Sequence, residues 1–107
     1  MDDQRVINLE TVFGSEKKFI TNGYYRIRQL DDNQKEVAFL ISSGCGSTSV
    51  HPQITIKKIK NEWVPIKLID MGTSPTQMIY RDENNQKYLD EKFECLITKF
   101  EQAIKQS

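Results

Sequence analysis

The stretch that decides the fold is residues 88–105, YLDEKFECLITKFEQAIK. Its apolar residues recur at spacings of three and four, and charged residues fill most of the positions between them; the apolar set is Leu89, Phe93, Leu96, Ile97, Phe100 and Ile104. This spacing places one apolar stripe along a helix. The sequence therefore predicts an amphipathic helix from about residue 86 to residue 105, roughly 30 Å long and able to cross a small sheet.

Upstream of this helix, the chain has the pattern of strands joined by tight turns. The segments 23–30 (GYYRIRQL) and 35–42 (KEVAFLIS) flank the polar turn DDNQ, which predicts a β-hairpin. Alternation puts the apolar Tyr25 and Ile27 on one face of the first strand, and on the other face Tyr24, Arg26 and Arg28. The second strand is apolar on both faces, which predicts an interior strand or one whose second face is covered by the helix.

A second hairpin is predicted over residues 53–70, QITIKKIKNEWVPIKLID, with its turn at KNE. The isoleucines alternate up to Ile56, but Ile59 falls on the other parity, which predicts a bulge near residues 57–58. Pro65 has no N–H to donate to a ladder, so its strand belongs at a sheet edge or pairs there only through its carbonyl.

Two segments fit more than one element. Residues 5–13, RVINLETVF, fit a strand or a short helix with Asn8 as its N-cap, and the Val and Ile content favours the strand. Ser74 precedes Pro75 and lies three residues before a glutamine, which is typical of a capping box. We expect a short helical turn over about 75–80.

Together these elements predict a single α+β domain over residues 1–107. Its antiparallel sheet of four or five strands lies between about residues 5 and 70, and the long C-terminal amphipathic helix packs on one face of that sheet. A chain of 107 residues buries roughly two thirds of its unfolded surface, which gives a real core but disfavours a deep cavity between subdomains.

Composition argues against some classes of partner, although it leaves a local basic patch open. Fifteen basic and fifteen acidic residues give a formal net charge of zero, whereas proteins that grip nucleic acid through its phosphates usually carry an excess of Lys and Arg. No segment approaches the ~20 apolar residues that span a bilayer, and MDDQRVINLE lacks a signal-peptide pattern. We expect a cytoplasmic protein with no membrane partner, although a leader removed before Met1 would leave no trace.

The loop 42–53, SSGCGSTSVHPQ, is the strongest candidate for chemistry. Cys45 could act as a nucleophile if His51 served as its base. Pro52 holds His51 extended at the start of a strand, however, and no oxyanion-hole element can be assigned nearby. The glycines that flank Cys45 favour a turn between hairpins, so we expect no catalytic residue here.

Metal and cofactor sites are also not expected. Cys45 and Cys95, even with the single histidine, are too few for a zinc site, and no phosphate-binding loop is present. We expect free thiols, with Cys95 a small core residue next to the apolar stripe. A single disulfide is the alternative if the chain meets an oxidising compartment. The paired acids fall in solvated turns or on the solvent face of the helix, where no raised pKa for acid catalysis is expected.

By elimination, we expect a non-enzymatic protein-binding module, most simply an inhibitor or immunity-type protein that covers the active surface of a toxin or enzyme. Tyr, Trp and Arg anchor protein interfaces, and acidic turns could complement a basic nuclease. The expected contact residues are Tyr24, Arg26, Arg28, Asp31, Asp32, Trp63, Lys67, Asp82 and Glu83.

Two alternatives stay open. The strand face with Tyr24, Arg26 and Arg28 could stack and neutralise RNA or single-stranded DNA, and Cys45 with His51 could form a thiol enzyme. An edge strand or the helix margin could also pair with a second copy, which leaves a homodimer open.

Overall fold

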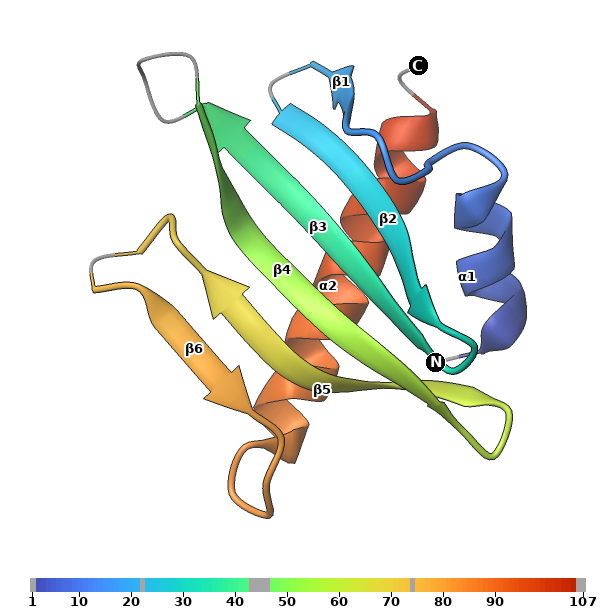
Figure 1. Ribbon diagram of the computed structural model, residues 1–107, viewed down its shortest axis with the longest axis vertical. Helices are drawn as coiled ribbons and strands as arrows, with labels where there is room; N and C mark the ends of the chain where they lie inside the picture. The colour runs from blue at the N-terminus through green and yellow to red at the C-terminus, as the bar shows by residue number, and fades with distance from the viewer. Residues whose placement is uncertain (1, 22, 43–46, 74, 106–107) are drawn as a thin grey trace.

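The computed structural model describes residues 2–21, 23–42, 47–73 and 75–105. The described chain is α+β, with one antiparallel sheet whose strands follow sequence order, β1-β2-β3-β4-β5-β6 (Figure 1). In chain order the elements are α1 (Asp3–Glu10), β1 (Lys18–Ile20), β2 (Gly23–Asp31), β3 (Gln34–Ser42), β4 (Thr48–Ile59), β5 (Glu62–Asp70), β6 (Gln77–Tyr80) and α2 (Gln86–Ile104).

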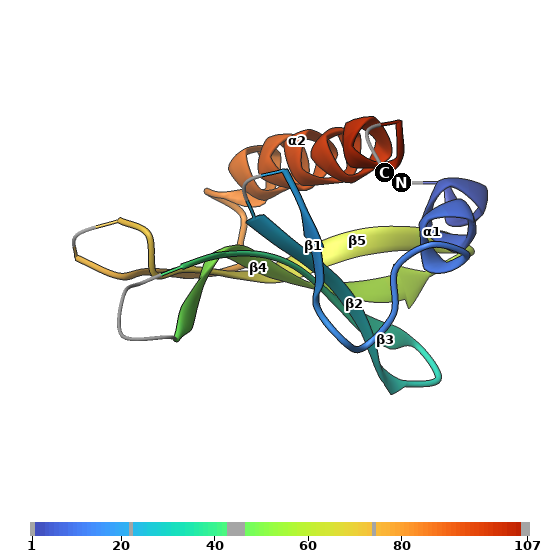
Figure 2. The ribbon, with the colours of Figure 1, turned by 90° about the horizontal axis from the view of Figure 1, so that it is seen from above.

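The predicted C-terminal helix is confirmed. Helix α2 ends at Ile104 with Lys105 as its C-cap, and Figure 2 shows it lying across one face of the sheet. Its buried residues are Leu89, Phe93, Leu96, Ile97, Phe100 and Ala103, that is, the apolar stripe without Ile104, which is partly buried, and with Ala103 added. The apolar stripe of α2 therefore covers the core on one face of the sheet, as its spacing predicts.

The first hairpin is also confirmed. Strands β2 and β3 pair in antiparallel register, and β3 lies between β2 and β4 in the interior of the sheet. Tyr25 and Ile27 are buried beneath the helix, whereas Tyr24, Arg26 and Arg28 lie on the opposite face. Both faces of β3 are apolar because one meets the helix and the other lies at the centre of the uncovered face.

The second hairpin forms, but its bulge lies elsewhere than predicted. Thr55 pairs with Lys67 and Ile56 pairs with Pro65, so Ile66 is the extra residue and the bulge is on β5. The ladder skips beside Pro65 because proline offers no N–H. Strand β5 lies between β4 and β6, so the prediction of an edge strand is wrong; β6 pairs with β5 only from Lys67 onward, however, and does not pair with Pro65. The turn is tight, with positive φ at both of its residues, Lys60 (51°) and Asn61 (65°), as two-residue hairpins prefer.

The expectation of a strand at residues 5–13 is wrong, because residues 3–10 form helix α1. The side chain of Asp2, rather than Asn8, caps the helix by accepting a hydrogen bond from the Gln4 N–H at 3.2 Å. Val6 and Leu9 are buried one helical turn apart, and Phe13 is buried just after the helix. Burial of this stripe therefore outweighs the weak strand preference of its Val and Ile residues.

The helical turn expected at 75–80 is also wrong. Residues 77–80 form β6, which pairs with β5 in the register Lys67 with Tyr80 and Ile69 with Met78. Ser74, the expected N-cap, lies outside the described residues. The run QMIY instead extends the sheet, because its β-forming residues complete the ladder of β5. With β1 at the other edge, the sheet has six strands rather than four or five.

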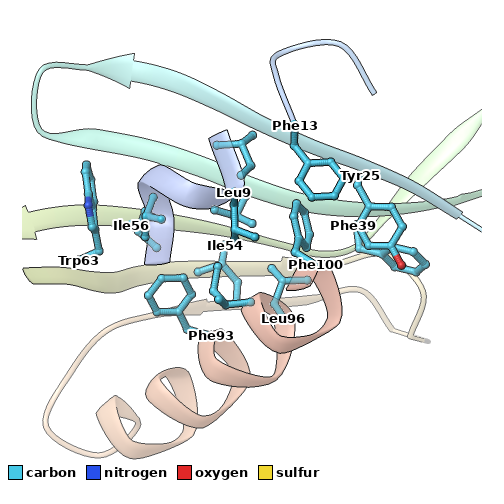
Figure 3. Close-up of a cluster of buried hydrophobic side chains, with 14 of the residues drawn as sticks. Leu9, Phe13, Tyr25, Phe39, Ile54, Ile56, Trp63, Phe93, Leu96 and Phe100 are labelled. Carbon is cyan, nitrogen blue, oxygen red and sulfur yellow. The ribbon is translucent and has the colours of Figure 1, made fainter. Parts of the chain in front are cut away.

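The core joins α2, the sheet and the N-terminal segment. Phe100 on α2 packs edge-on against Phe13 at 5.0 Å and against Tyr25 at 4.9 Å between ring centroids, as Figure 3 shows. Arg5 on α1 binds both Glu94 and Glu101 on α2 at 2.9 Å. Aromatic packing inside and ion pairing outside therefore fix the two helices to the same face of the sheet.

Candidate functional site

The face of the sheet opposite α2 carries no helix in the described part of the chain (Figure 2). Since the alternate residues of each strand, such as Tyr25, Val37, Ile54 and Leu68, form the core, their strand neighbours point to this second face. We call it the open face. It is defined by cross-strand partners in register: Phe19, Tyr24, Arg26, Arg28, Glu36, Ala38, Leu40, Gln53, Lys67, Ile69, Met78 and Tyr80.

One end of the open face is aromatic. Phe19 on β1 is 57% exposed and packs edge-on against Tyr24 on β2, with 5.1 Å between ring centroids. The Lys17 ammonium lies 4.9 Å from the centroid of the Tyr24 ring. Leu40, which pairs with Tyr24, is only 4% exposed although it lies outside the main core cluster. This end of the open face therefore presents packed apolar side chains with the Lys17 ammonium beside them.

The centre of the open face holds two arginines around one carboxylate. The Arg26 guanidinium lies 3.3 Å from Glu36 and 3.2 Å from the Gln53 amide oxygen. Arg28 lies 3.7 Å from the same Glu36 oxygen. Arg26 and Glu36 are largely buried, whereas the Arg28 side chain is about half exposed. The carboxylate orients both cations, and Arg28 keeps donors that are free to meet a partner.

The other end of the open face lies on β5 and β6. Met78 is 54% exposed and Tyr80 is 59% exposed, which is high for large apolar side chains. The Lys67 ammonium lies 5.4 Å from the centroid of the Tyr80 ring. Sequence reasoning missed Met78, Tyr80 and Phe19, because β6 was expected to be helical and β1 was not foreseen. The β-forming run QMIY was the signal that could have revealed the first two.

The predicted contact residues do not all meet at one place. Tyr24, Arg26, Arg28 and Lys67 lie together on the open face. Two pairs of acids lie apart from it at exposed positions: Asp31, the last residue of β2, with Asp32 in the turn that follows, and Asp82 with Glu83 after β6. The Asp31 carboxylate accepts from the Asn33 N–H at 2.8 Å, and that of Asp82 accepts from the Asn84 N–H at 2.8 Å. These two carboxylates therefore stabilise their own turns.

Trp63 does not lie on the open face. It is 3% exposed and on the helix side of the sheet, where its indole N–H donates to the Asp3 carboxylate at 2.7 Å. The bulge at Ile66 explains the error, because one extra residue reverses the parity between Trp63 and Leu68 and brings both to the same face. Trp63 therefore belongs to the core.

The contact between Trp63 and Asp3 gives an expected pH dependence of stability. The indole hydrogen bond, followed by the charge of Lys58, lowers the pKa of Asp3 below its ordinary value. A carboxyl group whose pKa is lower in the folded state stabilises the protein above its unfolded pKa, and the contribution is lost as the pH falls through the folded pKa. We therefore expect Asp3→Asn to be less stable than the wild type at pH 6 and the difference to shrink toward pH 3.

Urea denaturation at a series of pH values measures this difference. Trp63→Phe removes the hydrogen-bond donor and keeps a large ring. The loss of stability between pH 6 and pH 3 should therefore be smaller in this variant than in the wild type. A constant gap between wild type and Asp3→Asn at all these pH values would contradict the assignment.

A second candidate site lies on the helix side, where β4, β5 and β6 meet α2. His51 belongs to β4, and its ring Nδ1 lies 2.5 Å from Oδ1 of Asp70 on β5. The same Asp70 oxygen accepts from the Gly72 N–H at 2.8 Å. A pocket of about 200 Å³ opens beside this pair, and its lining includes Pro52, Leu68, Gln77, Lys92, Cys95, Leu96 and Lys99.

The structure places the two candidate thiols differently. Cys45, with the glycines on either side of it, lies outside the described residues, so the structure does not test the alternative of a thiol enzyme built on Cys45 and His51. Cys95 is a free, exposed thiol at the rim of the apolar stripe rather than a small core residue. Among the described residues, no group of three or more His, Cys, Asp or Glu side chains could hold a metal ion.

Comparison with known proteins found no matching family model, no significant match among curated proteins and none among solved structures. Within the described residues, no helix has the length and apolar character needed to cross a membrane.

Proposed function

We propose that this chain is a non-enzymatic protein-binding module whose partner docks on the open face. The observation that supports this most is the exposure of Phe19, Met78 and Tyr80, each more than half exposed, on a sheet face without a helix over it in the described residues. Aromatic residues, Met and Arg are enriched at the centres of protein interfaces. Rigid strands also present these side chains at little cost in conformational entropy.

The charge of the open face indicates the chemistry of the partner. Arg26 and Arg28 share one carboxylate, Glu36, and Lys67 adds a further cation near Tyr80. The complementary surface is a protein patch with carboxylates at its centre, opposite the arginines, and apolar side chains on either side of them. The acidic turns with Asp31, Asp32, Asp82 and Glu83 would then lie at the rim and face basic side chains of the partner.

The form that we favour is an inhibitor or immunity-type protein that covers the active surface of an enzyme or toxin. A standard interface buries ~800 Å² on each partner, and the molecule extends 40 × 33 Å along its two longer axes. The face can therefore cover an active-site cleft without any chemistry of its own. RNA or single-stranded DNA fits less well, because Glu36 already offsets part of the arginine charge and the net charge is zero.

The test compares variants of exposed side chains in affinity capture, followed by titration of the captured partner. Tyr80→Ser and Met78→Ser should each weaken binding by about tenfold or more, because each removes a large, exposed apolar side chain that the partner would bury. Ile7→Ser is the matched control, because Ile7 is also exposed (43%) but lies on α1, away from the open face. Inhibition of an enzymatic partner by the wild type would support the inhibitor form.

Two results would overturn the proposal. One is equal binding of a partner by wild type, Tyr80→Ser and Ile7→Ser. The other is binding of single-stranded RNA or DNA that weakens steeply with salt and is lost in Arg26→Ala with Arg28→Ala, which would assign the open face to nucleic acid.

A further inference from the structure

The pocket beside His51 and Asp70 lies on the opposite side of the sheet from the open face, so it is independent of the proposed docking surface. It is bounded by β4 and β5 on the sheet side and by α2 above. A neighbouring hollow shares His51, Asp70, Gln77 and Lys92 and extends toward Tyr88, so the two form one continuous depression.

Two ammonium groups, which only donate hydrogen bonds, line this pocket. Lys92 and Lys99 line it from α2, three residues before and four residues after Cys95, which puts them on one side of the helix. Asp70 is the one carboxylate among the described lining residues, and its Oδ1 is already engaged by His51 and by the Gly72 N–H. The described lining therefore has two ammonium groups and one carboxylate, and this excess of positive charge attracts an anion.

The lysines are also held in place. The Lys99 ammonium lies 3.9 Å from the centroid of the Phe39 ring, and that of Lys92 lies 5.5 Å from the Tyr88 centroid. Cation–π contacts restrict these long side chains, so less conformational entropy is lost when a ligand binds.

The floor of the pocket is apolar. Pro52, Leu68 and Leu96 contribute to the lining between the sheet and α2. A ligand that fits both the floor and the lysines has an anionic head and a short hydrocarbon part. The part of the depression between Lys92, Lys99 and the apolar floor has a volume of about 200 Å³, below the range of ~300–1,000 Å³ typical of drug-sized ligands, so the part of the ligand that it encloses is small.

The arrangement of His51 and Asp70 requires the backbone at Gly72 to lie very close to the imidazole ring. A Cβ at Gly72 would lie 2.1 Å from His51 Nδ1, and no carbon can occupy that position. Only glycine therefore lets the backbone donate to Asp70 while the imidazole lies against the same carboxylate.

We propose that this pocket binds a small amphiphilic anion, a carboxylate or phosphate monoester with a short hydrocarbon part, between Lys92, Lys99 and the apolar floor. The imidazole of His51, oriented by Asp70, forms the end wall of the site. Function at this pocket does not require the open face, and either site can operate without the other.

Titration with hexanoate, hexyl phosphate and hexanol, followed by amide chemical shifts, tests the proposal. Shifts should concentrate at residues 51–52, 68–70 and 92–99, and hexanol should bind about fivefold or more weakly than the better anion. The ratio of hexanoate to hexyl phosphate affinity identifies which head group the site prefers.

The test variant and the control variant each lose two positive charges, so their net charges are equal. Lys92→Gln with Lys99→Gln should weaken anion binding by about fivefold or more, whereas Lys87→Gln with Lys105→Gln, at exposed positions outside the pocket lining, should leave it nearly unchanged. As a second readout, anion binding should slow alkylation of Cys95 by iodoacetamide in a Cys45→Ser background, because Cys95 lines the pocket. Equal binding of hexanol and both anions, or equal losses in the two double variants, would overturn the proposal.

Discussion

Replacing Phe100 by alanine is expected to lower the free energy of unfolding by about 3–5 kcal/mol. Phe100 is 0% exposed, and its ring packs against rings from two other parts of the chain, Phe13 after α1 and Tyr25 on β2. Truncation would remove both edge-to-face contacts and leave a cavity where α2, the sheet and the N-terminal segment meet (Figure 3). Urea denaturation followed by circular dichroism measures the change.

Phe19→Ala is the matched control, because it makes the same chemical change on the open face, where the ring is 57% exposed. We expect it to cost less than about 1 kcal/mol, since the ring loses only its contact with Tyr24. Equal losses of stability in the two variants would show that burial of Phe100 in the apolar stripe of α2 stabilises the protein no more than an exposed ring does.

Gly23→Ala is expected to destabilise the fold by about 1–3 kcal/mol through overpacking. A Cβ at this position would lie 2.3 Å from two atoms of the Phe39 ring and 3.1 Å from the Leu40 carbonyl oxygen. The Phe39 ring cannot simply turn away, because it packs against Tyr25 at 5.2 Å and lies under the Lys99 ammonium. Thermal and urea denaturation both measure the loss.

A double-mutant cycle tests the cause of that loss. Phe39→Leu shortens the side chain that meets the new methyl group, so Gly23→Ala should cost clearly less in that background. Gly14→Ala provides the control, since a Cβ there meets no atom within 4 Å. Additive effects of Gly23→Ala and Phe39→Leu would contradict the steric explanation.

The parts of the fold that could be predicted from the sequence are those whose periodicity is long and local. The stripe from Leu89 to Ile104 repeats over several turns, and the alternation around Tyr25 continues across a whole hairpin. Helix α1 and strand β6 are short, and each has competing local signals: the Val and Ile content of α1 favours a strand, and the capping-box pattern at Ser74 competes with the β-forming run QMIY. Their type depends on burial of Val6 and Leu9 and on pairing with β5, which no local pattern contains.

The candidate sites were predictable only where no bulge intervened. Alternation correctly placed Tyr24, Arg26 and Arg28 on one face, because β2 runs without a bulge through these residues. Trp63 was misplaced by one extra residue at Ile66. The contact of His51 with Asp70 spans 19 positions of sequence and depends on the register of β4 and β5. Such a contact cannot be predicted from the spacing of residues in the sequence.

The order of elements along the chain has a consequence for synthesis. All of the strands described here precede α2, so the ribosome releases the whole apolar sheet before the helix that shields it. Until α2 emerges, the nascent sheet presents the surface around Ile54 and Leu68 to water, to chaperones and to other nascent chains. Variants that weaken α2 should therefore reduce soluble yield in cells more than their loss of stability in vitro suggests.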